Sequence, residues 1–236
     1  MRWNRNCRDL NLVVLAGLFF LAAVFAPIKQ RSLECIGPQK LSDRILLLDA
    51  GHGGEDGGAV SVTGKPESGI NLAIVLRLDA LCGFFGVNTI LTRQDDTSLK
   101  DKNSKTLAQM KRTDLNNRVK LVNSQQNAVL ISIHQNFFFG SNNTGSQVFF
   151  APTAGSELLA LHCQQILVQK LDPSNHRQAK KISSDIYLMN HVTCPAILVE
   201  CGFLSNQAEA HKLEEAGYQT KLAAAILTAY LTFPPS

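Results

Sequence analysis

The chain has 236 residues, of which 45% are hydrophobic and 18% charged, with 16 glycines, 8 prolines and a formal net charge of +4. This length suits one domain or slightly more, and the apolar content excludes a disordered or collagen-like chain. The charged fraction lies below the roughly 25% of typical soluble proteins, so an apolar segment dilutes it. The small positive charge does not indicate a nucleic-acid partner.

The diluting segment lies near the N-terminus. Residues 10–28 carry no charged side chain, and three arginines precede them. This order is typical of an export signal, because the arginines stay on the cytoplasmic side. The run is close to the roughly 20 residues that span a bilayer, and Pro27 follows Ala26, where a signal peptidase could otherwise cut. We interpret residues 1–28 as an uncleaved membrane anchor, with a cleaved signal peptide as the alternative. Either places the protein outside the cytoplasm, at the outer face of the cytoplasmic membrane or in the cell wall.

The remaining chain divides into a linker over residues 29–43 and a folded body over 44–236. Short apolar runs in the body predict buried strands, and helical patterns alternate with them. The expected strands cover 45–49, 87–92, 128–134, 147–151 and 196–200, and the expected helices cover 68–85, 108–125, 156–171 and 208–232. Such alternation predicts a single α/β domain with a mostly parallel twisted sheet and helices on both faces. The polar stretch 94–113 is expected to be a long solvated loop.

Cysteine spacing predicts thiols rather than bridges. The six cysteines show no paired spacing and no C-x-x-C motif, which argues against disulfides and against a cysteine-zinc site. We expect most of them to be buried as small apolar side chains.

Chemically capable side chains gather at the predicted carboxyl ends of the strands, where open parallel sheets bind ligands. His52 follows the first strand within a glycine-rich loop, His134 ends the third, and Glu200 ends the last. Glu67 opens the first helix after the glycine-rich loop, which returns it to the same edge. His191 lies in a polar loop and is a weaker candidate for substrate contact.

Two imidazoles and a carboxylate make the donor set of an open catalytic zinc site, which keeps a fourth position for water. We therefore interpret His52, Glu67 and His134 as metal ligands and zinc as the cofactor. Zinc lowers the pKa of bound water and polarises an amide carbonyl. Glu200 is then the candidate general base, which takes the proton of the water and returns it to the leaving nitrogen.

These residues and the segments around them resemble a known family, the zinc-dependent N-acetylmuramoyl-L-alanine amidases. Four segments occur in the order of that family, and an arginine and an asparagine before its third strand match Arg118 and Asn123; the segments read LLLDAGHGGEDGGAV, PESGINLAI, SIHQN and PAILVECGFLSN. The resemblance covers about residues 44–232. It implies zinc ligands at His52, Glu67 and His134 and a catalytic carboxylate at Glu200.

The resemblance also implies the substrate: the enzyme would hydrolyse the amide between the muramic acid lactyl group and L-alanine of peptidoglycan. The anchor, the compact body and the ESGINL and CGFLSN segments are most similar to the germination-specific amidases of spore formers, which act in forming muramic-lactam in the spore cortex. This likeness makes an accessory protein a plausible partner. Only residues 135–145 separate two strands where some relatives insert an autoinhibitory helix. The sequence departs from many relatives at Ala50 and Gln135, and Gln135 is expected to narrow or polarise the groove beside His134.

Two other functions fit the same residues. The metal could serve a peptidase or deacetylase acting on the cell wall, and a wall-binding protein could retain the fold without catalysis. All four candidate positions are occupied by competent side chains, which favours an active amidase.

Overall fold

The computed structural model describes residues 44–139 and 143–233. The predicted anchor and linker therefore lie outside the described residues. Within the described part of the chain, we find no helix with the length and apolar content needed to cross a membrane.

A six-stranded sheet forms the centre of the domain, in the order β2-β1-β3-β6-β4-β5. Its parallel part comprises β2, β1, β3 and β6, whereas β4 runs antiparallel to β6 and β5 runs parallel to β4. The strands are β1 (Ile45–Ala50), β2 (Thr89–Leu91), β3 (Ala128–Asn136), β4 (Gln147–Phe150), β5 (Lys180–Lys181) and β6 (Ala196–Phe203). The predicted α/β domain with a mostly parallel sheet is confirmed.

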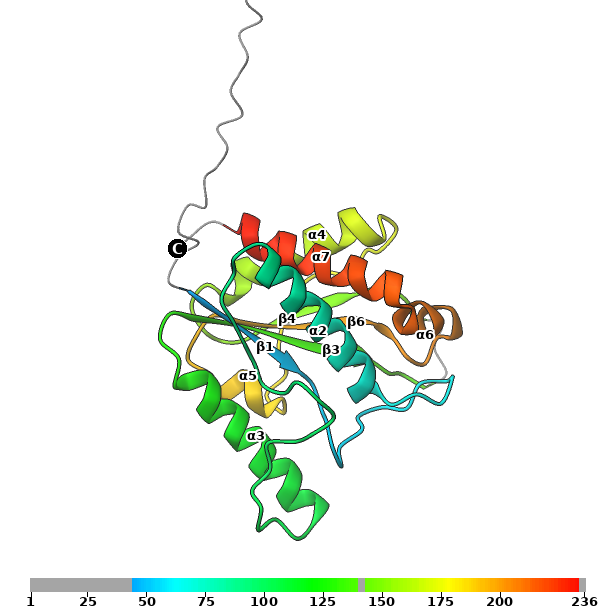
Figure 1. Cartoon of the computed structure of the whole chain (residues 1–236). Helices are drawn as coiled ribbons and strands as arrows, with labels where there is room; N and C mark the ends of the chain where they lie inside the picture. The colour runs from blue at the N-terminus through cyan, green and yellow to red at the C-terminus, as the bar shows by residue number, and fades with distance from the viewer. Residues whose placement is uncertain (1–43, 140–142, 234–236) are drawn as a thin grey trace, which may run out of the picture. The chain divides into compact units, whose positions relative to one another are not determined.

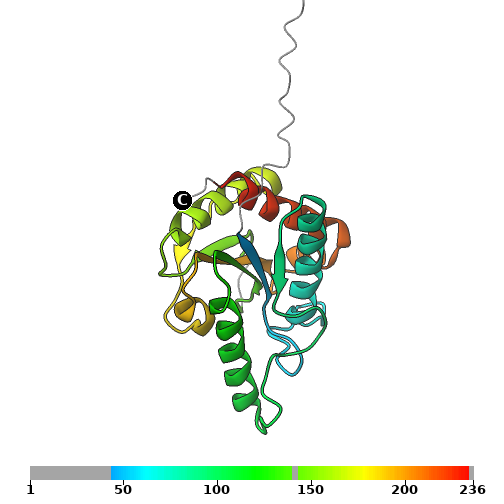
Figure 2. The same ribbon diagram turned by 60° about the vertical axis from the view of Figure 1, so that its left-hand side comes forward.

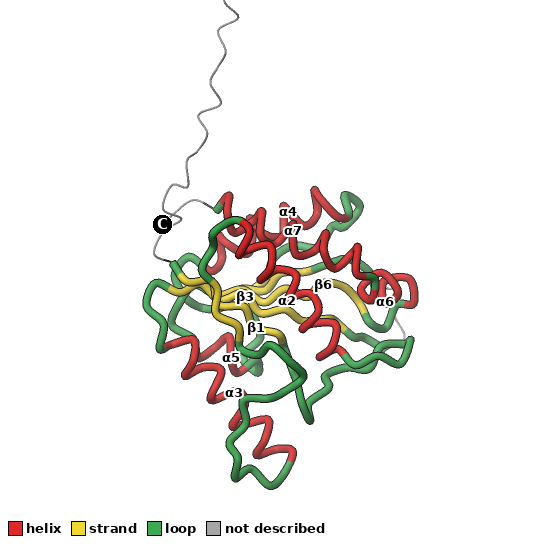
Figure 3. The backbone as a smooth tube through the Cα atoms, viewed as in Figure 1, coloured by secondary structure: helices red, strands yellow, loops and turns green. Residues whose placement is uncertain are grey.

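Helices cover both faces of this sheet (Figures 1 and 3). One layer contains α2 (Glu67–Phe84), α4 (Ser156–Leu171), α6 (Gln207–Glu214) and α7 (Ala216–Thr232), and the other contains α3 (Leu107–Asn123) and α5 (Tyr187–His191). Figure 2 shows α3, in green, below the sheet, with its far end projecting away from it. Alternate strand residues supply the two cores: Leu46 and Leu48 pack toward α2, and Leu47 packs toward α3.

The direction of β4 follows from the length of the connection before it. The chain leaves β3 at Asn136 and enters β4 at Gln147. A parallel neighbour needs a crossover of a dozen or more residues, usually a helix, whereas a shorter connection returns the chain from the same edge. The segment after β3 is therefore short enough to make β4 antiparallel.

Three local features differ from the sequence-based expectation. The predicted helix over 208–232 is two helices, because Glu215 is extended and Gln219 donates a hydrogen bond to the freed Leu213 carbonyl. The predicted loop over 94–113 ends earlier, since Thr106 and Gln109 form a capping box that starts α3. The third feature is the pair of short elements β5 and α5, which carry too few residues for a periodic signal.

Candidate active site

Four predicted site residues meet at the carboxyl edge of the parallel strands. His52 lies just beyond β1, His134 and Glu200 occupy paired positions on the neighbouring strands β3 and β6, and Glu67 is the first residue of α2. One ligand atom from each of His52, Glu67 and His134 lies within 4.8 Å of the others. The fold thus brings together residues that are up to 148 positions apart in the sequence.

Glu67 is the central side chain of this group. Its Oε2 lies 3.3 Å from His52 Nε2, and its Oε1 lies 3.0 Å from His134 Nδ1. The backbone N–H groups of Ala59 and Gln135 also donate to its two oxygens. Burial alone raises the pKa of Glu67, but the bonds and charges of His134 and His52 outweigh it and hold the pKa well below its usual range. Glu67 is therefore an ionised, fixed carboxylate.

Glycines allow the His52 loop to approach these side chains closely. A Cβ on Gly58 would lie 2.6 Å from Glu67 Oε2, and a Cβ on Gly51 would lie 2.3 Å from the His134 ring. His52 itself has a φ of 62°, which is uncommon for a residue with a side chain. The loop is therefore shaped around the two rings and the carboxylate.

Two buried arginines hold the backbone of this loop in place. Arg93 donates to the carbonyls of Ala50 and Gly51, and Arg118 donates to those of Ala50 and His52. Each arginine comes from a different element: Arg93 follows β2, and Arg118 projects from α3. These bonds satisfy carbonyls that leave the ladder at the end of β1 and help to maintain the unusual conformation of His52.

Arg118 also joins a buried ionic network beneath the loop. It contacts Asp49 at 2.6 Å and Asp114 at 2.9 Å, and the Ser132 hydroxyl donates to Asp49. Burial raises the pKa of Asp49, yet Arg118 and Ser132 outweigh burial and lower it to about 2. Arg118 is thus a structural support of the loop.

The second nitrogen of His52 has its own partner. His52 Nδ1 lies 3.0 Å from Asp56 Oδ2, on the side of the ring away from Glu67. Burial lowers the pKa of His52, but hydrogen bonds to Asp56 and Glu67 outweigh it and raise the pKa to about 9. The ring orientation is therefore fixed from both nitrogens.

Glu200 has a contrasting environment. Its Oε2 is buried and has no hydrogen-bond partner in the described structure. Burial raises the pKa of Glu200 to about 7, against a lowering by the nearby His134. A carboxyl group with a pKa near neutrality can exist in both protonation states at physiological pH, which suits proton transfer.

The expectation for Gln135 is wrong. Its side chain is buried and donates to Asn71 Oδ1, while Asn71 donates to Glu67 Oε1 and to the Gly51 carbonyl. Successive strand residues point to opposite faces, so Gln135 lies on the other face from His134. It supports Glu67 through Asn71 and does not line the groove.

His191 lies apart from these residues. It ends α5, its Nδ1 contacts the Tyr187 carbonyl, and its own carbonyl accepts a bond from Asn123. Asn123 ends α3, which leads into β3, and the loop after His191 leads through Pro195 into β6. Both segments therefore lie at the amino edge of the sheet, opposite the candidate site. Neither His191 nor Asn123 therefore reaches the candidate site.

Sequence reasoning missed Arg93, Asp56 and Asn71 as supports of the site. Two of them carried a local signal: Arg93 is a charged residue directly after a strand, and Asp56 lies four residues after His52 in the glycine-rich loop. Asn71 lies one helical turn after Glu67, which places both on the same face of α2. The four cysteines of the described residues are free thiols, of which Cys82, Cys163 and Cys201 are buried, as expected.

The fold and the donor set together define an α/β protein with a candidate His–Glu–His metal site at the carboxyl edge of its sheet. The family model for N-acetylmuramoyl-L-alanine amidase matches residues 46–231. The chain therefore belongs to the N-acetylmuramoyl-L-alanine amidase family, and its activity is hydrolysis of the amide between muramic acid and L-alanine in peptidoglycan.

Relatives and solved structures agree with this assignment. The germination-specific N-acetylmuramoyl-L-alanine amidase of Bacillus subtilis is 39% identical over 195 residues, covering 82% of this chain and 81% of the relative. The CwlD amidase of Clostridioides difficile, solved in complex with the GerS lipoprotein, is 38% identical with a TM-score of 0.76, covering 80% and 97% of the two chains. The catalytic domain of CwlV, from Bacillus (Paenibacillus) polymyxa, is 26% identical with a TM-score of 0.65, covering 81% and 99%.

Proposed function

We propose that this amidase uses zinc held by His52, Glu67 and His134, with Glu200 as the catalytic carboxylate. Zinc binds histidine nitrogen and carboxylate oxygen in proteins. One such atom from each of these three residues lies within 4.8 Å of the others, which supports a shared ion. Three protein ligands also leave one coordination position for water or substrate, as a catalytic site requires.

The chain's own residues divide the chemistry between them. Zinc, when bound, supplies a Lewis acid that polarises the amide carbonyl and acidifies water. Glu200 takes a proton from the attacking water as the new C–O bond forms. It then delivers this proton to the nitrogen of L-alanine as the C–N bond breaks, which regenerates the Glu200 carboxylate. Glu67, fixed by two backbone N–H groups, keeps both histidine rings facing the site.

One observation carries the role of Glu200. Its Oε2 is the one buried carboxylate oxygen without a partner among the described residues, and it belongs to the strand position paired with His134. An unpartnered buried carboxylate costs stability, so a structural role does not explain it. A group that exchanges protons with water and substrate does.

The test combines metal dependence with product identity. Purified protein should lose peptidoglycan hydrolysis in a chelator and regain it with zinc. Mass spectrometry of the digest should show peptides with a free L-alanine amine and an intact glycan. Full activity after complete removal of metal would contradict the zinc mechanism, and cleavage within the peptide or loss of acetyl groups would indicate a peptidase or deacetylase.

We further propose that the substrate is spore cortex peptidoglycan and that the activity contributes to muramic-lactam formation. The similarity to the germination-specific amidase of Bacillus subtilis and to CwlD supports this role. Expression in a spore former that lacks its own germination-specific amidase should restore muramic-lactam to the cortex. Restored hydrolysis of vegetative wall, without muramic-lactam in the cortex, would contradict the spore role.

The proposed setting is the outer face of the cytoplasmic membrane, with residues 1–28 as anchor, 29–43 as linker and 44–236 as catalytic domain. Fractionation followed by N-terminal sequencing distinguishes an anchored chain from a cleaved one. We also propose an accessory protein, because CwlD was solved in complex with a lipoprotein. Full turnover by the purified, zinc-loaded chain alone would contradict a requirement for such a partner.

A further inference from the structure

We infer that Asp56 is a positioning residue of the metal site, which fixes the ring and tautomer of His52 and thereby raises metal affinity. The inference rests on the proposed role of His52 as a ligand. Asp56 Oδ2 lies 3.0 Å from His52 Nδ1, while His52 Nε2 points to Glu67 at 3.3 Å. A neutral imidazole has a single N–H. Donation of that proton from Nδ1 to Asp56 leaves the Nε2 lone pair free for a metal.

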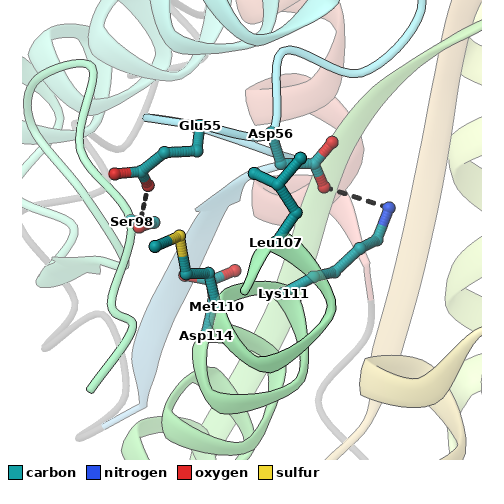
Figure 4. Close-up of a pocket in the computed structure, with 8 residues that line it drawn as sticks. Glu55, Asp56, Ser98, Leu107, Met110, Lys111 and Asp114 are labelled. Atoms are coloured by element: carbon teal, nitrogen blue, oxygen red, sulfur yellow. Dashed lines mark hydrogen bonds and ion pairs between the residues drawn. The ribbon is translucent and has the colours of Figure 1, made fainter. Parts of the chain in front are cut away.

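Asp56 is itself held by short-range contacts. Gly53 and Asp56 exchange two backbone hydrogen bonds, and Gly58 N–H donates to Asp56 Oδ1. Lys111 of α3 lies 3.1 Å from the same Oδ2 that faces His52. Asp56 and Lys111 line a cavity of about 140 Å³ between the His52 loop and α3. Figure 4 shows their side chains directed toward each other. The carboxylate therefore has little freedom to turn away from His52.

Glu55 provides a matched control in the same loop. Its carboxylate contacts Ser98 and Lys100 instead of a metal-site residue. Figure 4 shows Glu55 directed toward Ser98, away from the Asp56–Lys111 pair. Neutralising Glu55 thus changes the net charge as neutralising Asp56 does, but leaves the His52 contact intact.

The experiment measures zinc affinity of the full chain by competition with a coloured chelator. Loss of an outer-shell carboxylate typically lowers metal affinity by about 10–100-fold. Asp56→Ala should show this loss, and Asp56→Asn a smaller one, because an amide oxygen still accepts the Nδ1 proton. Glu55→Gln should stay within about threefold of the wild type, as expected for an exposed charge. The affinities are compared at a temperature at which each variant remains folded in excess chelator, as its thermal melting curve shows, so that a loss of zinc binding is not a loss of folding.

Two measurements keep the inference open to refutation. Wild-type zinc affinity in both Asp56 variants would overturn it, as would equal losses in Glu55→Gln and Asp56→Asn. If the variants fold poorly, nitrogen NMR of the wild-type imidazoles decides: zinc-loaded protein should show His52 protonated at Nδ1, and protonation at Nε2 would overturn the inference. Failure of the wild type to bind zinc at all would instead refute the proposed metal.

Discussion

The two sides of the site differ in how their acidic groups are satisfied. On the His52 side, every carboxylate near the loop has a cationic or N–H partner: Asp49 with Arg118, Asp56 with His52 and Lys111, and Glu67 with both histidines. On the β6 side, Glu200 has a buried oxygen without one. The pKa shifts follow this division: the pKa values of Asp49, Asp56 and Glu67 are lowered, and that of Glu200 is raised. In the mechanism proposed above, the fixed anions hold the metal site and the unsatisfied acid transfers the proton.

The largest expected effect comes from removing Glu200, the proposed proton carrier. Glu200→Gln should lower the rate of peptide release from peptidoglycan by about 10²–10⁴-fold, because general acid–base catalysis contributes that much. Zinc content should match the wild type, since Glu200 is not among the ligands. Mass spectrometry of timed digests measures the rate. A variant that keeps more than a tenth of the activity would break the contrast between the two sides.

The next largest effect is expected on stability, from the loss of the buried cation Arg118 on the His52 side of the site. Arg118→Met should lower the free energy of unfolding by about 3–5 kcal/mol, because it leaves Asp49 and Asp114 as buried charges without their cation. Denaturant titration measures the change. Arg112→Met, at an exposed position of the same helix, is the control and should stay within about 0.5 kcal/mol of the wild type. Equal effects of the two substitutions would remove the special role of the network.

The ionised state of Asp49 should be visible as a pH dependence. Its folded pKa of about 2 lies below the ordinary value of 3.8 for an aspartate, so the stabilisation is present above the unfolded pKa and is lost as pH falls through the folded pKa. This stabilisation is about 2 kcal/mol. Between about pH 4 and pH 2, the free energy of unfolding of the wild type should therefore fall by that much more than the free energy of unfolding of Asp49→Asn. Parallel pH profiles for the two proteins would show that Asp49 titrates normally.

A smaller effect is expected where the loop crowds the ligands. Gly58→Ala places a methyl group 2.6 Å from Glu67 Oε2 at a φ of +70°, and crowding of this kind costs about 1–3 kcal/mol. Gly64→Ala is the control, because Gly64 has a φ of +88° and no atom lies within 4 Å of the added Cβ. Its loss of unfolding free energy reports backbone strain alone and should be about 1 kcal/mol. Thermal unfolding in chelator compares them. Equal losses would mean that the loop can retreat from Glu67.

The strands and the four candidate residues could be predicted because their signals are local. Runs such as Ile45–Ala50 and Ala196–Phe203 are apolar over the length of one strand, and the chemistry-bearing residues stand at their carboxyl ends. The short elements β5 and α5 could not be predicted in the same way, since two and five residues are too few for a period. The division into two helices at Glu215 could not be predicted either, because the apolar pattern continues on both sides of it.

The sequence by itself determined the fold class, the identity of the candidate ligands and the family, because residue type and order are enough for each. Only the tertiary structure decided which side chains support the site. Arg93 and Arg118 reach the Ala50 carbonyl across 43 and 68 positions, and the Gln135 side chain contacts Asn71 and not the groove. Such contacts depend on strand pairing and on the face each residue presents. Both are set by packing between distant segments, which no local pattern records.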